Sequence, residues 1–171
     1  LSRFVRNGYT EKAEIEWEAL KEAVYNVVRF TDNTISWNMY LNPLEKQRIA
    51  TGETRRLGVG VMGIADMLNQ LGISYDSNEG ISLISQVMKV IANTAYKTSG
   101  LLAKEKEPSP IFNYEKYSKN PFFQESLDED VKELIKKNGL RNIAILTIAP
   151  TGTISNAVLG FKNKDNFYPG V

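Results

Sequence analysis

Apolar residues recur at helical spacing along much of this chain, and the pattern predicts four helices. They cover residues 14–35, 63–71, 78–105 and 128–138. Gly72 and Gly139 follow the second and fourth helices, where glycine commonly ends a helix. One face of the longest helix is formed by Ile81, Ile84, Met88, Ile91, Ala92, Ala95, Ser99 and Leu102. Residues 38–54 are polar and irregular, with a short helix at most, and residues 108–121 form a loop.

Two short apolar segments, residues 57–61 and 143–148, have the character of strands. Residues 143–148 are almost continuously apolar and rich in β-branched side chains, so that no solvent-facing side is visible. This pattern is typical of a strand covered on both faces, as in parallel α/β sheets. Two strands do not make a stable sheet. The predicted fold class is therefore α/β with helix in excess, with part of the sheet outside these residues.

The segment after the second strand combines a turn with small and hydroxylated residues, Pro150, Thr151, Gly152, Thr153, Ile154 and Ser155. Pro150 stops the strand, and Gly152 permits close approach of the backbone. Thr153 or Ser155 is expected to cap a helix over residues 156–159. A strand followed by the free N–H groups of a helix start is suited to bind an anion. The same residues are also ordinary turn and cap residues, and the Gly-Lys-Ser/Thr signature of a nucleotide-binding P-loop is missing.

Composition excludes several kinds of chemistry. The chain has 171 residues, a net charge of +1, no cysteine and no histidine. Disulfides, thiolate nucleophiles, Cys- or His-ligated zinc and Ser-His-Asp catalysis are excluded. No basic field points to nucleic acid or an anionic membrane, and no apolar run approaches the ~20 residues of a membrane span. Residues 1–4 lack the layout of a signal peptide, so we expect a cytoplasmic protein without nucleic-acid or membrane partners.

Other motifs favour structural roles. Gly58, Gly60 and Gly63 match the G-x-G-x-x-G pattern, but Arg55 and Arg56 stand where a dinucleotide-binding site needs a hydrophobic strand. Those glycines are better explained by close packing. The two arginines are expected to be solvated or in ion pairs more often than bound to phosphate. For Gly139 and Asn142 we expect structural roles in a turn, and for the aromatic residues of positions 112–123 a loop packed on the domain.

Four motifs in a fixed order carry a resemblance to a known family. They lie at residues 56–63, 72–77, 139–142 and 149–155. The chain resembles, over essentially its whole length, the catalytic subunit of ribonucleotide reductases. The form of residues 151–155 and the segment 161–171 resemble the adenosylcobalamin-dependent class. The resemblance implies a ten-stranded α/β barrel around a cysteine-bearing finger loop, and radical replacement of the ribose 2′-hydroxyl by hydrogen. It also implies that the turn from Pro150 to Ser155 holds the substrate phosphates by backbone amides and hydroxyls.

The chain departs from the family in lacking the radical cysteine, its partner Asn and Glu, and the redox cysteine pair. We therefore expect residues 1–171 to be a single segment of a larger catalytic barrel domain, without catalytic residues and inactive alone. No cofactor is expected on this chain by itself, while adenosylcobalamin is implied for the whole enzyme. The expected partners are a ribonucleotide phosphate and either the flanking barrel segments or a second copy. Two alternatives remain, a non-catalytic interaction or regulatory module that retains the fold and an unrelated α/β phosphate-binding domain.

Overall fold

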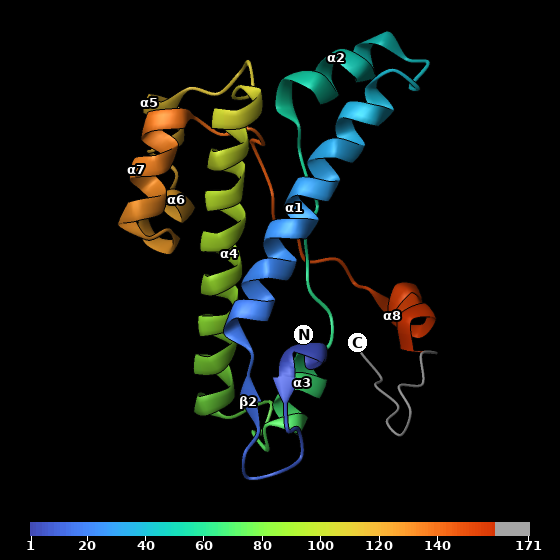
Figure 1. The fold of residues 1–171 in the computed structure, drawn as a ribbon, viewed down its shortest axis with the longest axis vertical. Coiled ribbons are helices and arrows are strands. Elements are labelled where there is room, and N and C mark those ends of the chain that lie inside the picture. The colour runs from blue at the N-terminus through green and yellow to red at the C-terminus, as the bar shows by residue number, and fades with distance from the viewer. Residues whose placement is uncertain (160–171) are drawn as a thin grey trace. The chain divides into compact units, whose positions relative to one another are not determined.

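The computed structural model describes residues 1–159, and helices make up most of them (Figure 1). The α-helices are α1 (Trp17–Met39), α2 (Glu45–Thr54), α3 (Ile64–Gln70), α4 (Asn78–Lys106), α5 (Tyr114–Tyr117), α6 (Pro121–Ser126), α7 (Glu129–Asn138) and α8 (Gly152–Leu159). A single 3-10 turn, η1 (Ser2–Phe4), precedes a small antiparallel pair of strands, β1 (Val5–Arg6) and β2 (Glu14–Ile15). No helix in this part of the chain is both long and apolar enough to cross a membrane.

The chain forms two compact units. The first contains residues 1–20, 60–88 and the segment from Ile148 onward, and the second contains residues 21–59 and 89–147. In the first unit α3 packs against η1, and Met67 and Leu68 of α3 are buried. Gly63, with φ 77°, precedes α3. Helices α1 and α4 each begin in the first unit and continue into the second.

The core of the second unit lies between α1, α4 and α7. Its fully buried side chains include Val28, Leu102, Ile135, Leu140 and Ile145. Gly100 of α4 allows a close approach to α7, since a Cβ there would lie 3.2 Å from the Cδ2 of Leu134. At the C-terminus of α7, Gly139 has φ 77°. Its predicted role of ending this helix is confirmed.

The two segments predicted to be strands are not strands in the structure, but they form an isolated parallel bridge, with Val59 opposite Leu146. The N–H of Leu57 donates to the carbonyl of Ala144 at 2.8 Å, and the N–H of Thr147 donates to the carbonyl of Val59 at 2.9 Å. The expectation that residues 143–148 are covered on both faces is not met within the described residues, and their expected neighbours lie partly outside this chain. Ile145 is fully buried, but Thr147 is exposed and Ile148 is 64% exposed. Packing in the described residues covers only part of this segment.

Several predicted boundaries need correction. Residues 14 and 15 belong to β2, so the first helix begins at Trp17. The segment 38–54, predicted to be irregular with a short helix at most, contains the ten-residue helix α2, and the loop 108–121 contains the short helix α5. Ile81, assigned to the packed face of the long helix, is 59% exposed, while Val87 is buried. The boundaries predicted for α4 agree with the structure to one residue.

The aromatic residues of positions 112–123 pack on the second unit, as predicted. Tyr117 contacts Phe112 and Phe123, with ring centroids 5.5 Å and 5.9 Å apart. Its hydroxyl donates to the carbonyl of Ile143 at 3.1 Å. Burial raises the pKa of Tyr117, and the neighbouring Tyr96 acts in the same direction. The hydroxyl therefore remains protonated and joins this loop to the start of the second strand segment.

Candidate functional site

The predicted phosphate turn is the start of helix α8. The helix begins at Gly152, and Thr151 before it has φ 57°. The first N–H groups of any helix lack partners within that helix. Here the N–H of Ser155 reaches the carbonyl of Thr151 at 2.8 Å. The N–H groups of Gly152, Thr153 and Ile154 are therefore the ones available to an anion.

The turn is open around its glycine. Pro150, Gly152 and Thr153 are exposed, and among the described residues beyond its chain neighbours and its own helix backbone no atom lies within 4 Å of a Cβ built on Gly152. This openness suits an approach of a ligand to the backbone. The predicted capping roles are wrong, because Thr153 and Ser155 both lie inside the first turn of the helix rather than before it.

Ser155 differs from the other hydroxylated residues of the turn. It is buried, and its hydroxyl donates to the carbonyl of Gly152 at 2.8 Å. Its hydroxyl proton is therefore engaged within the helix in this structure. Thr153 remains exposed at the helix start. The segment 161–171, which the family resemblance also used, lies outside the described residues.

A second group of polar residues, not foreseen as a site, lies in the second unit around the fully buried carboxylate of Asp32. Arg55 donates from Nε and from one terminal nitrogen to Asp32 Oδ1, at 2.9 Å and 2.7 Å. The same guanidinium reaches the carbonyl of Asp32 at 2.9 Å and the hydroxyl of Ser36 at 2.8 Å. The sequence prediction of an ion pair for Arg55 is confirmed, but the pair is buried rather than on the surface.

Asn142 completes this group from the far end of the sequence. Its Nδ2 donates to Asp32 Oδ1 at 3.1 Å and to the carbonyl of Arg55 at 3.0 Å. Ser99 donates to Asn142 Oδ1 at 2.9 Å and accepts from the N–H of Asn142 at 3.0 Å. The structural role predicted for Asn142 is confirmed. It joins α1, α4 and the backbone that follows α2.

Two further cations lie near the same carboxylate. Arg141 Nε is 3.5 Å from Asp32 Oδ1, and Lys106 Nζ is 3.6 Å from Asp32 Oδ2. Burial acts to raise the pKa of Asp32, but the hydrogen bonds and charge of Arg55, helped by Asn142 and Arg141, leave that pKa below its ordinary value. Arg141 also donates to the carbonyls of Lys106 and Glu107 and so caps the C-terminus of α4. Three cationic side chains, Arg55, Arg141 and Lys106, thus share the one carboxylate of Asp32 in a structural network.

One signal in the sequence points to this network. Asp32 occurs four residues after Val28, on the face of the helix that otherwise carries apolar residues. A charged residue at such a position is buried only if it is paired. The partners themselves were not recognisable as such, because they come from three distant segments.

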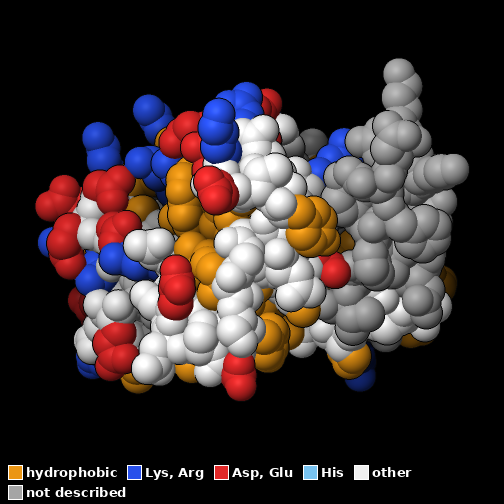
Figure 2. All heavy atoms as spheres, turned by 90° about the horizontal axis from the view of Figure 1, so that it is seen from below, with side chains coloured by type: hydrophobic (Ala, Val, Ile, Leu, Met, Phe, Trp, Pro, Cys, Tyr) orange, Lys and Arg blue, Asp and Glu red, His pale blue; other side chains and the backbone are white. Residues whose placement is uncertain are grey.

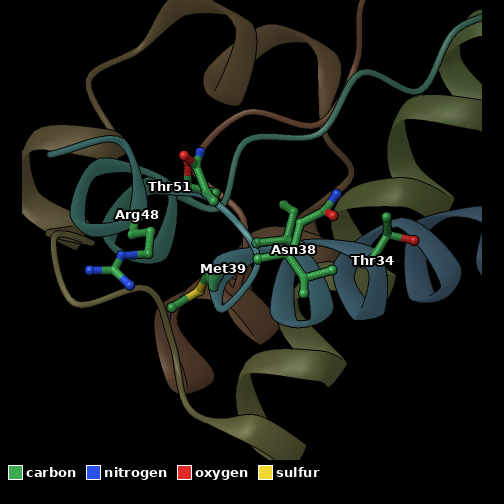
Figure 3. A pocket seen from close by; sticks show the side chains of 8 residues that line it. Thr34, Asn38, Met39, Arg48 and Thr51 are labelled. Atoms are coloured by element: carbon green, nitrogen blue, oxygen red, sulfur yellow. The ribbon is translucent and has the colours of Figure 1, made fainter. Parts of the chain in front are cut away.

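The described residues contain no group of three acidic side chains that could hold a metal ion. A cavity of about 430 Å³ lies between the C-terminal half of α1 and α2 (Figure 3). Its lining residues are Thr34, Ile35, Asn38, Met39, Leu41, Asn42, Arg48 and Thr51. The cavity carries one charged side chain, Arg48, and no catalytic grouping.

Comparison with known proteins identifies the family. The family model "Ribonucleotide reductase, barrel domain" matches residues 1–169. The chain is 36% identical over 155 residues to a vitamin B12-dependent ribonucleoside-diphosphate reductase of Thermoplasma acidophilum, covering 91% of this chain and 17% of that protein. It is 32% identical over 155 residues to a protein of the same description from Mycobacterium tuberculosis, covering 91% of this chain and 19% of that one.

A relative of a different description is similar as well. The alpha subunit of a ribonucleoside-diphosphate reductase from Chlamydia pneumoniae is 33% identical over 166 residues, covering 85% of this chain and 16% of that protein. The chain thus spans less than a fifth of the length of these relatives. The match covers both compact units and includes the turn at the start of α8. This chain belongs to the ribonucleotide reductase barrel-domain family.

Proposed function

We propose that this chain is a segment of the catalytic barrel of a vitamin B12-dependent ribonucleotide reductase, and that it supplies the turn that binds the substrate phosphate. The names of the relatives from Thermoplasma and Mycobacterium support the B12-dependent type. The complete ten-stranded barrel belongs to this proposal. The described residues contribute to this barrel the parallel pairing of residues 57–59 with residues 144–147.

The observation that carries the proposal is the open helix start at Gly152. Backbone N–H groups at this end of a helix, together with the positive end of the helix dipole, favour a phosphate without a basic side chain. The hydroxyl of Thr153 is exposed beside them and adds a donor. The site proposed is Pro150, Thr151, Gly152, Thr153, Ile154 and Ser155, with Ser155 stabilising the first turn through its bond to Gly152.

The chemistry of reduction is assigned to other parts of the enzyme. Adenosylcobalamin would supply the radical when bound. No step of the reaction is assigned to the residues of this chain. Their role is to bind the phosphate and to hold the ribose at a fixed distance from that anchor.

The test is Gly152→Val in the longer enzyme that contains this segment. A Cβ at Gly152 meets no atom within 4 Å in the part of the chain that the structure describes, apart from its own neighbours and helix backbone, so the fold should accept valine. A phosphate held by the backbone would lose one or two charge-assisted hydrogen bonds, at about 1.5–3 kcal/mol each. The expected loss of substrate affinity is roughly ten- to a hundredfold or more.

Two further variants should show smaller losses of substrate affinity. Gly152→Ala should weaken binding less than valine because its side chain is smaller, and Thr153→Ala should also have a smaller effect because only a hydroxyl is lost. Thermal unfolding of each variant checks that the fold is retained. Unchanged affinity in a folded Gly152→Val enzyme would show that the phosphate is bound elsewhere.

A further inference from the structure

Helix α1 is apolar on two opposite sides within the second unit. One side carries Val24 and Val28 and is buried. On the other side Phe30 and Trp37 are 69% and 83% exposed. They lie seven residues apart and so share one face of the helix. Leu41, which follows the end of the helix at Met39, is 76% exposed. An apolar face of this kind that is exposed to solvent is typical of an interaction surface.

The outer face is also free of charge. Between Phe30 and Leu44 the sequence has one charged residue, Asp32, which is fully buried. Tyr40 and Leu44 extend the exposed apolar surface around the end of the helix. Depletion of charged residues together with enrichment in Trp, Tyr and Phe distinguishes the core of protein interfaces from ordinary surface. Elsewhere acidic and basic side chains are interspersed over the surface seen in Figure 2.

A concave feature adjoins this face. The cavity of about 430 Å³ between α1 and α2 is lined by Met39 and Leu41, and Arg48 is its one charged lining residue (Figure 3). A cavity beside exposed aromatic residues can receive an anchoring side chain, which is the usual arrangement at the centre of an interface. A membrane surface fits less well, because interfacial helices carry Lys and Arg on their polar side.

We propose that this uncharged face, formed by Phe30, Trp37, Tyr40, Leu41 and Leu44, is covered by another part of the same enzyme polypeptide. The inference rests on the proposed function, in which the chain is one segment of a longer catalytic chain. The match covers 16–19% of the relatives, so their remaining length is ample to provide the cover. The three aromatic side chains alone present about 400 Å² or more, a substantial part of the ~800 Å² that each side of a stable interface buries.

Hydroxyl-radical footprinting read by mass spectrometry tests the proposal, because it reports the exposure of single side chains in a protein of any length. The 171-residue chain and the longer enzyme are oxidised under the same radical dose. The oxidation rate of Trp37 should fall about fivefold or more in the longer enzyme, as expected for an aromatic anchor at an interface centre. Tyr75, which is 61% exposed and precedes Asp76, is the comparison residue outside this face.

Equal oxidation of Trp37 in both proteins would overturn the proposal. So would protection that appears in the 171-residue chain with rising concentration and is absent from the longer enzyme, since it would assign the face to a second copy. The readout uses no nucleotide. If Trp37 is protected in the longer enzyme but that enzyme binds no ribonucleotide phosphate, the proposed function is contradicted and the covering of this face is still supported.

A pair of substitutions gives an independent readout. Trp37→Gln should leave the urea midpoint of the 171-residue chain nearly unchanged, because the side chain is exposed there. In the longer enzyme the same substitution should lower the midpoint clearly, while the matched variant Tyr75→Gln should lower it less. Equal effects of Trp37→Gln in the two proteins would contradict a covering segment.

Discussion

Asp32 illustrates how a single buried charge depends on its neighbours. Its carboxylate is fully buried and is held by the guanidinium of Arg55 and the amide of Asn142. Replacing a buried ion pair as a whole can be nearly neutral, but removing one partner leaves the other charge uncompensated. When Asp32 is replaced, Arg55 stays charged because it cannot lose its proton. The loss of stability is therefore determined by this buried, unpaired guanidinium.

Asp32→Asn should lower the free energy of unfolding by about 3–5 kcal/mol, the cost typical of breaking a buried pair. The side chain keeps its size, so the loss is electrostatic. Urea unfolding measures it. The control is Asp130→Asn, whose ion pair with Lys97 is exposed, with an N–O distance of 2.9 Å, and which should cost at most about 1 kcal/mol. Equal costs for the two variants would contradict the buried network.

The same carboxylate should make stability depend on pH in the acid range. Its pKa in the folded protein lies below the ordinary value of 3.8. The ionised carboxylate therefore makes its full contribution to the free energy of unfolding above pH 3.8. This contribution is lost as the pH falls through the lower pKa of the folded state. The difference in unfolding free energy between wild type and Asp32→Asn should narrow between about pH 6 and about pH 3. Urea titrations at both pH values check this, and a constant difference would contradict it.

Among the elements, helices with local signals were predictable from sequence, and those that depend on tertiary packing were not. The long helix α4 agrees with its prediction because its periodicity extends over many turns and a cap precedes it. The hairpin of β1 and β2 consists of two-residue strands with no periodicity to read, and α2 has few apolar residues. The position of the turn at Gly152 was predicted, whereas the Asp32 network depends on residues up to 110 positions apart.

Gly139 and Gly72 allow a matched test of the helix ends. Both have positive φ, 77° and 71°. A Cβ on Gly139 would lie 2.8 Å from the Cβ of Pro108, while one on Gly72 meets no atom within 4 Å among residues 1–159 apart from its chain neighbours. Gly72→Ala should cost about 1–2 kcal/mol for the left-handed backbone alone. Gly139→Ala should cost more, about 2–4 kcal/mol, since its ψ of −169° lies outside the left-handed helical region and overpacking is added. Urea unfolding measures the free energy of unfolding of the two variants. Equal losses would contradict overpacking of the new methyl group against Pro108.

At the scale of the whole molecule, the chain should not reduce ribonucleotides by itself. The family resemblance places both the radical and the reductant on cysteine sulfur, and this chain has no cysteine. The assay supplies the purified chain with adenosylcobalamin, a dithiol and each ribonucleotide in turn, beside a reaction without protein. The expected yield of deoxyribonucleotide equals that of the blank. Product above the blank would require a different chemistry from the one the family implies.

The long sequence separations within the Asp32 network have a consequence for biosynthesis. Asn142 bonds to Asp32 and to Arg55 across 110 and 87 residues. Proteins are synthesised from the N-terminus at about 5–20 residues per second. Asn142 is therefore added roughly 5–20 s after Asp32. During that interval the carboxylate and its guanidinium partner remain without the amide that later joins them. Because such distant contacts form late, substitutions at Asn142 should mainly accelerate unfolding. Until residue 142 has been added, the polar network around Asp32 cannot be complete in the nascent chain.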